Sequence, residues 1–172
     1  GGLADVVGAL PRALAALGIE VRTLVPGYPA VLSRLGQAHA LVTLDDLFGD
    51  RGELLTADLD GARVLVLEAP HLYDRPGGPY QAPGGHDWPD NARRFAALGW
   101  VASEIARGRL GDWRPDIVHA HDWQAGLAPA YPALAGGPRP PTILTIHNIA
   151  FQGQFGAHLL PELRLPPHAW GV

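Results

Sequence analysis

Two short clusters of polar side chains follow apolar, strand-like runs in the second half of the chain. The first run, residues 117–120, comes after the breaker Pro115-Asp116, and the second covers residues 142–146. The polar residues at the two strand ends are His119, His121, Asp122, Trp123, His147 and Asn148. In open α/β sheets, ligands bind outside the carboxyl ends of the strands. The sequence therefore predicts a ligand site where these two strands end.

Two other interpretations of the histidines stay open. His119 could be a buried, hydrogen-bonded core residue. Alternatively, His119 and His121 lie on the same face of a strand at spacing i, i+2, which permits metal ligation. Metal binding is disfavoured because no third ligand sits at a diagnostic spacing and the chain has no cysteine. The expectation is a site without metal.

Composition narrows the class of protein and of partner. The 172 residues suffice for one domain with a substantial core, and 47% hydrophobic and 17% charged residues are typical of globular proteins. A net charge of -4 without a basic run argues against nucleic acid or an anionic membrane as partner, and favours a small or neutral molecule. The absence of cysteine excludes disulfides and thiol catalysis in this stretch. No apolar run reaches membrane-spanning length, so we expect a soluble, cytoplasmic protein.

The two ends of the sequence are unusual for an intact protein. The chain contains no methionine, opens on Gly1-Gly2 directly into a helical pattern, and stops at Gly171-Val172. We expect an excerpt from a longer chain, cut at both ends.

The first half predicts a helix, a strand and a hairpin. Apolar residues recur at helical spacing from Leu3 to Leu17, with Gly18 as the stop, and a strand follows over residues 20–25. This order is typical of a Rossmann-like unit. Gly1-Gly2 at the helix start could bind an anion such as a diphosphate, although a plain tight turn is the alternative. Strands at 54–59 and 63–68 flank Asp60-Gly61, a strong hairpin signal.

The elements that position the polar clusters come next. The run of Pro, Gly and aromatic residues at 69–80 predicts a long ordered loop that lasts until Asp90. Its rings Tyr73, Tyr80 and Trp88 are expected as platforms for a sugar or base, or as staples to the core. Asp90 is predicted to cap a helix that continues to Leu110, and residues 124–135 predict a short helix interrupted by prolines. Helices alternating with strands predict an α/β fold.

With these elements in place, the chain resembles the N-terminal domain of bacterial glycogen synthases and plant starch synthases, over residues 1 to about 164. Each motif alone is modest, but their order over nearly the whole chain is specific. The motifs are Gly1-Gly2-Leu3-Ala4-Asp5-Val6, Leu24-Val25-Pro26-Gly27-Tyr28-Pro29, Leu72-Tyr73-Asp74-Arg75-Pro76-Gly77, Asp90-Asn91 with Arg94-Phe95, His119-Ala120-His121-Asp122-Trp123, and Thr145-Ile146-His147-Asn148-Ile149-Ala150-Phe151-Gln152-Gly153.

The resemblance implies a GT-B fold, in which two Rossmann-like domains face each other across a cleft. Residues 1–172 would form a truncated N-terminal catalytic domain with a doubly wound parallel sheet and a hairpin excursion near 54–68, without the nucleotide-binding C-terminal domain. The implied activity is retaining transfer of glucose from ADP-glucose to the non-reducing end of an α-1,4-glucan, with no cofactor and no metal. This fragment alone is expected to be inactive.

The resemblance also assigns roles to individual residues. His147 matches a histidine that contacts the transferred glucose, and Asp122 matches a carboxylate needed for full activity. The implied substrate-binding residues are Gly1, Gly2, Asp5, Tyr80, His121, Trp123 and Asn148. The family's donor-binding lysine would precede Gly1. Gln124 stands where the bacterial enzymes often have histidine, which puts any proton transfer at that position in doubt.

Two rival functions remain on the sequence alone. A non-catalytic glucan-binding module of the same fold would be expected to lose a site residue, whereas His147, Asn148 and Asp122 are all present. A related glycosyltransferase with another nucleotide-sugar donor is not excluded, because the missing domain reads the donor base.

Overall fold

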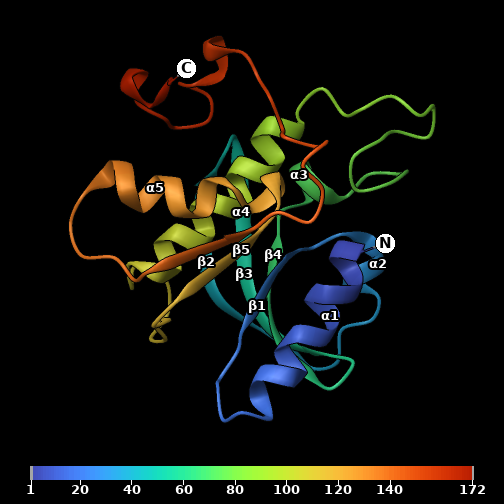
Figure 1. Ribbon diagram of the computed structural model, residues 1–172. Helices are drawn as coiled ribbons and strands as arrows, with labels where there is room; N and C mark the ends of the chain where they lie inside the picture. Colours follow the sequence, from blue (N-terminus) through green and yellow to red (C-terminus); the bar gives the residue numbers. More distant parts are fainter. Residues whose placement is uncertain (1, 172) are drawn as a thin grey trace. The chain divides into compact units, whose positions relative to one another are not determined.

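The computed structural model describes residues 2–171, which form two compact units, residues 1–75 and residues 76–172 (Figure 1). The first contains α1 (Gly2–Ala15), β1 (Thr23–Pro26), α2 (Pro29–Leu32), β2 (Ala38–Leu47), β3 (Asp50–Leu59), β4 (Ala62–Glu68) and α3 (Pro70–Tyr73). The second contains α4 (Asn91–Ala106), β5 (Val118–His121), η1 (Trp123–Ala125), α5 (Leu127–Ala135), β6 (Thr142–Thr145), η2 (Ala157–Leu159) and η3 (Pro167–Ala169).

The predicted hairpin of the first unit is confirmed. β3 and β4 pair antiparallel with Leu59 opposite Ala62. Asp60 and Gly61 both have positive φ, 52° and 78°, as a two-residue turn of this hand requires. The predicted helix is α1, and the predicted stop, Gly18, has φ 79°.

The doubly wound parallel sheet predicted from the sequence is not what the first unit contains. Its sheet has the order β1-β4-β3-β2, and only β1 and β4 are parallel. β2 was not predicted, because Asp45 and Asp46 near its end are poor strand formers and its burial pattern is mostly exposed. The core on one face of this mixed sheet comprises Leu55, Ala57, Val64 and Val66.

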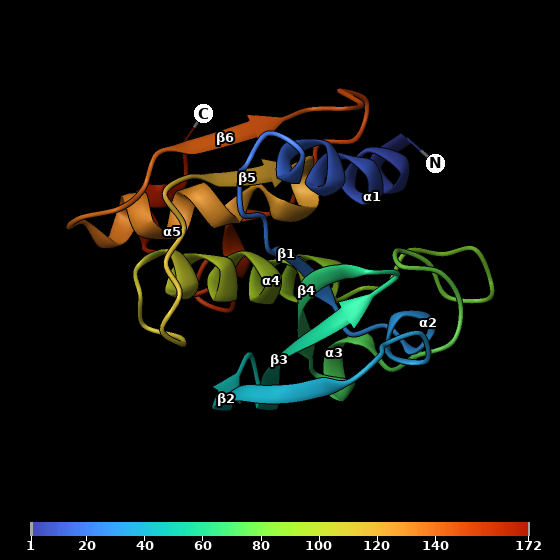
Figure 2. The ribbon, with the colours of Figure 1, turned by 90° about the horizontal axis from the view of Figure 1, so that it is seen from below.

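The second unit has a separate two-stranded parallel sheet. β5 pairs with β6 from Val118 opposite Thr142 to His121 opposite Thr145. Figure 2 shows α5 between this sheet and α4, in agreement with the contacts of α5 to β5, to β6 and to α4. Gly99 permits the close approach of α4 and α5, since a Cβ there would lie 3.0 Å from the backbone nitrogen of Ala128.

Three local predictions need correction. Asp90 precedes α4, as predicted, but its side chain makes no capping hydrogen bond. The helix ends at Ala106 rather than near Leu110, because Gly108 adopts a φ of 68° just beyond it. The stretch 69–80, predicted as loop throughout, begins with the one-turn helix α3, where Leu72 and Tyr73 are buried.

No helix within residues 2–171 is long and apolar enough to cross a membrane.

Candidate active site

The ends of β5 and β6 bring the two predicted polar clusters together. The backbone N–H of Asp122 donates to the carbonyl of Thr145 over 2.8 Å, and the backbone N–H of His147 donates to Oδ1 of Asp122 over 2.7 Å. These bonds tie the first residues beyond the two strands to one another. The prediction that both strand ends meet at one edge is therefore confirmed.

Asp122 adopts an unusual backbone conformation for a residue with a side chain. Its φ is 57° and its ψ is -175°, and the residue is buried, with 9% of its surface exposed. A conformation this sparsely populated costs about 1–3 kcal/mol and persists only where the surroundings hold it. Here the two hydrogen bonds across the strand ends supply that restraint.

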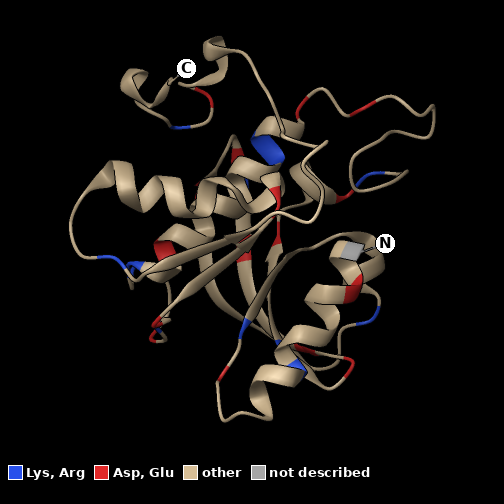
Figure 3. Ribbon diagram, in the orientation of Figure 1, with Lys and Arg blue, Asp and Glu red and all other residues tan. Residues whose placement is uncertain are grey.

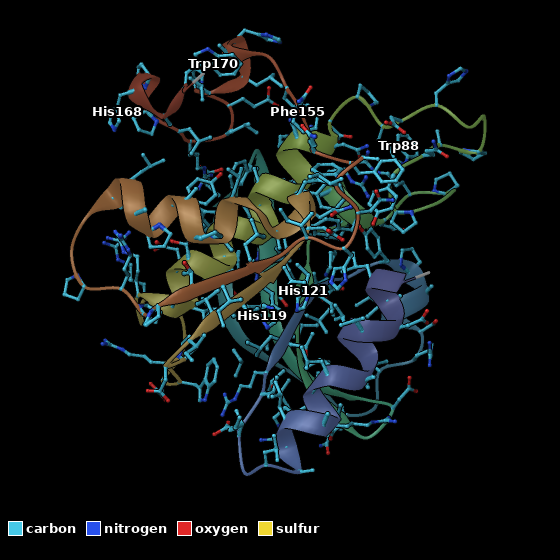
Figure 4. All side chains as sticks on the ribbon, in the orientation of Figure 1. Trp88, His119, His121, Phe155, His168 and Trp170 are labelled. Carbon is cyan, nitrogen blue, oxygen red and sulfur yellow. The ribbon has the colours of Figure 1, made fainter. Side chains whose placement is uncertain are left out.

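Three imidazole rings line up beside Asp122. His119 and His121, labelled in Figure 4, stack with ring centroids 4.2 Å apart. His121 and His147 stack with ring centroids 5.3 Å apart. Nδ1 of His121 and Nε2 of His147 share a hydrogen bond of 3.0 Å, and Nε2 of His119 shares one of 2.7 Å with Oγ1 of Thr145. His119 is exposed, so the interpretation of His119 as a buried core histidine is wrong. Thr145 carried no signal of its own in the sequence beyond its place at the strand end.

The surroundings favour the uncharged form of the central ring. Burial lowers the pKa of His121 below its ordinary 6.5, and the neighbouring His119 and His147 lower it further, while Asp122 opposes them. Within the described residues, no group of three or more His, Cys, Asp or Glu side chains is arranged to hold a metal ion. The cluster is a hydrogen-bonding array, able to contact hydroxyl groups of a ligand.

An aromatic wall adjoins the strand ends. Trp123 lies 4.9 Å from Phe95, 6.5 Å from Tyr80 and 5.8 Å from Phe155, measured between ring centroids. Figure 4 labels Phe155 in the segment after β6. The indole packs against Gly153, which has φ 59° and where a Cβ would overlap the ring. Flat rings in this arrangement offer apolar faces to a sugar ring.

Tyr80 is held in place by two residues of α4 that carried no predicted role. Arg94 is fully buried, and its Nη1 donates to the carbonyl of Pro79 over 2.8 Å and to Oδ1 of Asn91 over 2.7 Å. Nδ2 of Asn91 donates to the carbonyl of Tyr80 over 2.9 Å. We call the pair Asn91 and Arg94, which holds residues 79 and 80, the bracket at the start of α4. In the sequence, an amide and a guanidinium three residues apart at the start of a predicted helix could have indicated it.

Two further polar side chains complete the description of this edge. Gln124 forms a hydrogen bond with Tyr80 that partly offsets the rise in the tyrosine pKa caused by burial. Its Oε1 is buried, with no hydrogen-bond partner in the part of the chain that the structure describes. Asn148 is exposed and its Oδ1 accepts from the backbone of Ala150 over 3.0 Å, which leaves its amide N–H groups for a ligand.

The glycine-led helix belongs to the other unit. Gly2 and the exposed Asp5 lie in the first turn of α1, in residues 1–75, whereas Gly1 lies outside the described residues. The structure thus assembles His121, Asp122, Trp123, His147, Tyr80 and Asn148 within one unit. A shared role for Gly1, Gly2 and Asp5 stays a prediction.

A hollow elsewhere in the second unit contains none of these residues. It has a volume of about 240 Å³ and lies between α4, α5 and residues 164–166. Its charged lining comprises Glu104, Arg107, Arg109 and Arg164, and Glu104 pairs with both Arg107 and Arg109.

Comparison with known proteins extends over the whole chain. The family model described as "Starch synthase catalytic domain" matches residues 1–172. The glycogen synthase of Rhodopseudomonas palustris (strain BisB18) is 58% identical over 172 residues, 100% of this chain and 35% of that protein. The glycogen synthase of Cereibacter sphaeroides (strain ATCC 17025) is 59% identical over 167 residues, 96% of this chain and 35% of that protein.

A solved structure shares the fold. The catalytic domain of starch synthase IV from Arabidopsis thaliana, bound to ADP and acarbose, superposes with a TM-score of 0.75 at 26% identity. The match covers 98% of this chain and 35% of that one. The chain thus spans about a third of the length of the proteins it matches.

Proposed function

The chain belongs to the starch synthase catalytic-domain family, and from this membership we propose that the intact protein is a retaining glucosyltransferase. It transfers glucose from ADP-glucose to the non-reducing end of an α-1,4-glucan. Support comes from the relatives named as glycogen synthases, at 58% and 59% identity, and from the ADP and acarbose bound to the Arabidopsis structure.

The observation that carries this proposal is the hydrogen bond between Asp122 and the backbone of His147. It joins, at 2.7 Å, the two residues to which the family resemblance assigns the chemistry. A carboxylate and an imidazole beside an aromatic wall suit a sugar that develops positive charge.

The proposed reaction divides opposite charges between different groups. As the bond between the anomeric carbon and the diphosphate breaks, the sugar becomes oxocarbenium-like. An acceptor hydroxyl then bonds to the anomeric carbon on the same face and gives its proton to the departing diphosphate. The carboxylate of Asp122 favours the positive charge, while His147 and Asn148 hydrogen-bond the sugar hydroxyls. Tyr80 and Trp123 provide the apolar platform. The N-terminus of α1, with Gly1, Gly2 and Asp5, would face the diphosphate, because unpaired N–H groups there favour an anion.

This function sets the expected partners and compartment. The donor is ADP-glucose, the acceptor is a neutral glucan, and the reaction needs no cofactor and no metal. Nucleic acid and membranes are not expected as partners, since the chain carries a net charge of -4. We expect the intact protein to act in the cytoplasm.

Donor choice is the direct test of the proposed activity. The intact protein is incubated with a glucan primer and radiolabelled ADP-glucose or UDP-glucose, and label in the polymer is counted. We expect incorporation from ADP-glucose with retention of the α configuration.

The other outcomes identify the rival functions. Incorporation from UDP-glucose alone would place the protein among transferases with another donor. No incorporation from either donor, with glucan binding intact, would identify a binding module.

A further inference from the structure

We propose that His121 is a positioning residue whose ring holds His147 in one tautomer and one orientation. This inference rests on the proposed function, since it concerns the histidine that contacts the transferred glucose. It changes the role predicted for His121, from a direct substrate contact to a contact made through His147.

The geometry between the two rings carries the argument. Nδ1 of His121 lies 3.0 Å from Nε2 of His147, and the ring planes differ by 16°. A hydrogen bond between two imidazole nitrogens requires one of them to carry the proton and the other to present a lone pair. Nε2 of His147 therefore bonds to His121, and Nδ1 of His147 remains for the sugar. If Nε2 of His147 carries the proton, Nδ1 of the same uncharged ring accepts a hydrogen bond, and if Nδ1 of His121 carries it, Nδ1 of His147 donates one.

His121 is itself restrained from its other side. Its ring stacks on His119 with centroids 4.2 Å apart, and His119 is bonded to Oγ1 of Thr145 on the neighbouring strand. His147 is fixed at its backbone by Asp122. His147 is thus held at its backbone N–H by Asp122 and at Nε2 of its ring by His121, and only the second contact depends on His121.

The surroundings of His121 favour its uncharged ring. The titratable groups that face it are His119 on β5, His147 after β6 and Asp122 at the end of β5. Burial and the two histidines disfavour a proton on His121, while Asp122 favours one. The bond between the rings is lost when both facing nitrogens, Nδ1 of His121 and Nε2 of His147, carry a proton, because two N–H donors cannot bond to each other.

The experiment compares His121→Ala with His121→Asn in the intact protein. The side-chain amide of asparagine occupies about the place of Nδ1 and restores a bond to His147, but it does not titrate. We expect His121→Ala to lower kcat for transfer from ADP-glucose by about 10- to 100-fold, because a misplaced reacting group costs about this much. KM for ADP-glucose should change by less than about threefold, and His121→Asn should recover most of kcat. His168→Ala, an exposed histidine in η3, is the control.

A second readout does not depend on the proposed activity. Nitrogen NMR of histidine-labelled intact protein reports the tautomer of His147, assigned by the signals lost in His147→Ala. We expect one tautomer in the wild type and in His121→Asn, and a mixture in His121→Ala. Should the wild type fail to transfer glucose, the proposed function fails while this measurement still decides the role of His121.

Two results would overturn the inference. One is a His121→Ala protein with the kcat and the His147 tautomer of the wild type. The other is a folded His121→Asn protein that is no better than His121→Ala in either readout.

Discussion

Asp122 combines two properties that substitution can separate: an acceptor for the His147 N–H and a negative charge. Asparagine keeps the acceptor and nearly the shape of aspartate, whereas alanine removes the acceptor as well as the charge. We expect the unfolding temperature of Asp122→Asn to lie within a few degrees of that of the wild type. Its activity should nevertheless fall by about 10²-fold, because a charge that stabilises the transition state is lost. Asp122→Ala should lose the activity and also about 2–3 kcal/mol of stability. Thermal unfolding and initial rates on the intact variants measure both effects.

Equal activity in Asp122→Asn and the wild type would show that the charge is not used. In that case Asp122 would serve only to join the two strand ends.

His121 also makes a prediction for stability against pH. Its pKa is lowered from 6.5 in the folded protein, so the unfolded chain binds a proton first as the pH falls. Stability should therefore be complete above pH 6.5 and should decrease as the pH falls from there through the lowered pKa. His121→Asn lacks this proton and should show a shallower loss between pH 7 and pH 5, measured by thermal unfolding. Identical slopes in the two proteins would contradict the shifted pKa.

Among the elements, the segment that follows β6 supports the aromatic wall through Gly153. A methyl group there would overlap the indole of Trp123. We expect Gly153→Ala to displace Trp123 and to raise KM for the glucan primer by about 10-fold, which corresponds to about 1.4 kcal/mol of binding. Initial rates over a range of primer concentrations give this value.

Gly85→Ala is the matched control for the backbone strain. Gly85 also has positive φ, 79°, but a Cβ there meets nothing within 4 Å. In both variants a side chain at positive φ destabilises the protein, but only the methyl group of Gly153→Ala displaces Trp123. A similar KM in the two variants would mean that the indole does not contact the glucan.

The bracket at the start of α4 makes a prediction for stability. Arg94→Met keeps much of the length and apolar stem but removes the donors to the buried Asn91 and to the partly buried carbonyl of Pro79. We expect a loss of about 2–4 kcal/mol, because Oδ1 of Asn91 is buried and both acceptors lose a donor. Chemical denaturation of the intact protein measures it.

The neighbouring Arg93→Met serves as the control. The side chain of Arg93 is 37% exposed and makes two long ion pairs, 3.6 Å to Asp90 and 3.7 Å to Glu162. Its loss should cost less than about 1 kcal/mol. Equal losses in the two variants would show that Arg94 is not the residue that holds the loop.

The helices and strands that carry the site were largely predictable from the sequence. The pairing of strands and the side-chain hydrogen bonds between elements were not. Apolar runs followed by His121 and by His147 predicted two strand ends at one edge, and Asp60-Gly61 predicted the hairpin. The pairing of β2 with β3, and hence the mixed sheet, depends on long-range contacts that hydrophobic periodicity does not encode. The bond between His121 and His147 likewise depends on strand register and ring orientation, which residue spacing does not determine.

At the scale of the whole molecule, the chain covers 35% of the length of each of the two glycogen synthases compared above. Figure 3 shows its acidic and basic positions dispersed among helices, strands and loops. The groups proposed for the sugar lie in residues 76–172, and those proposed for the diphosphate lie at the start of residues 1–75. Because the chain covers only about a third of the length of these relatives, we expect residues 1–172 alone to show no transfer from ADP-glucose in the same assay.

The most direct test of the central claim is the initial rate of transfer from ADP-glucose to a glucan primer in three intact proteins: the wild type, His147→Ala and His168→Ala. The account predicts a loss of about 10²-fold or more in His147→Ala, with glucan binding and thermal unfolding unchanged, and a wild-type rate in His168→Ala. A His147→Ala protein that keeps the wild-type rate would contradict the assignment of the active site to the ends of β5 and β6.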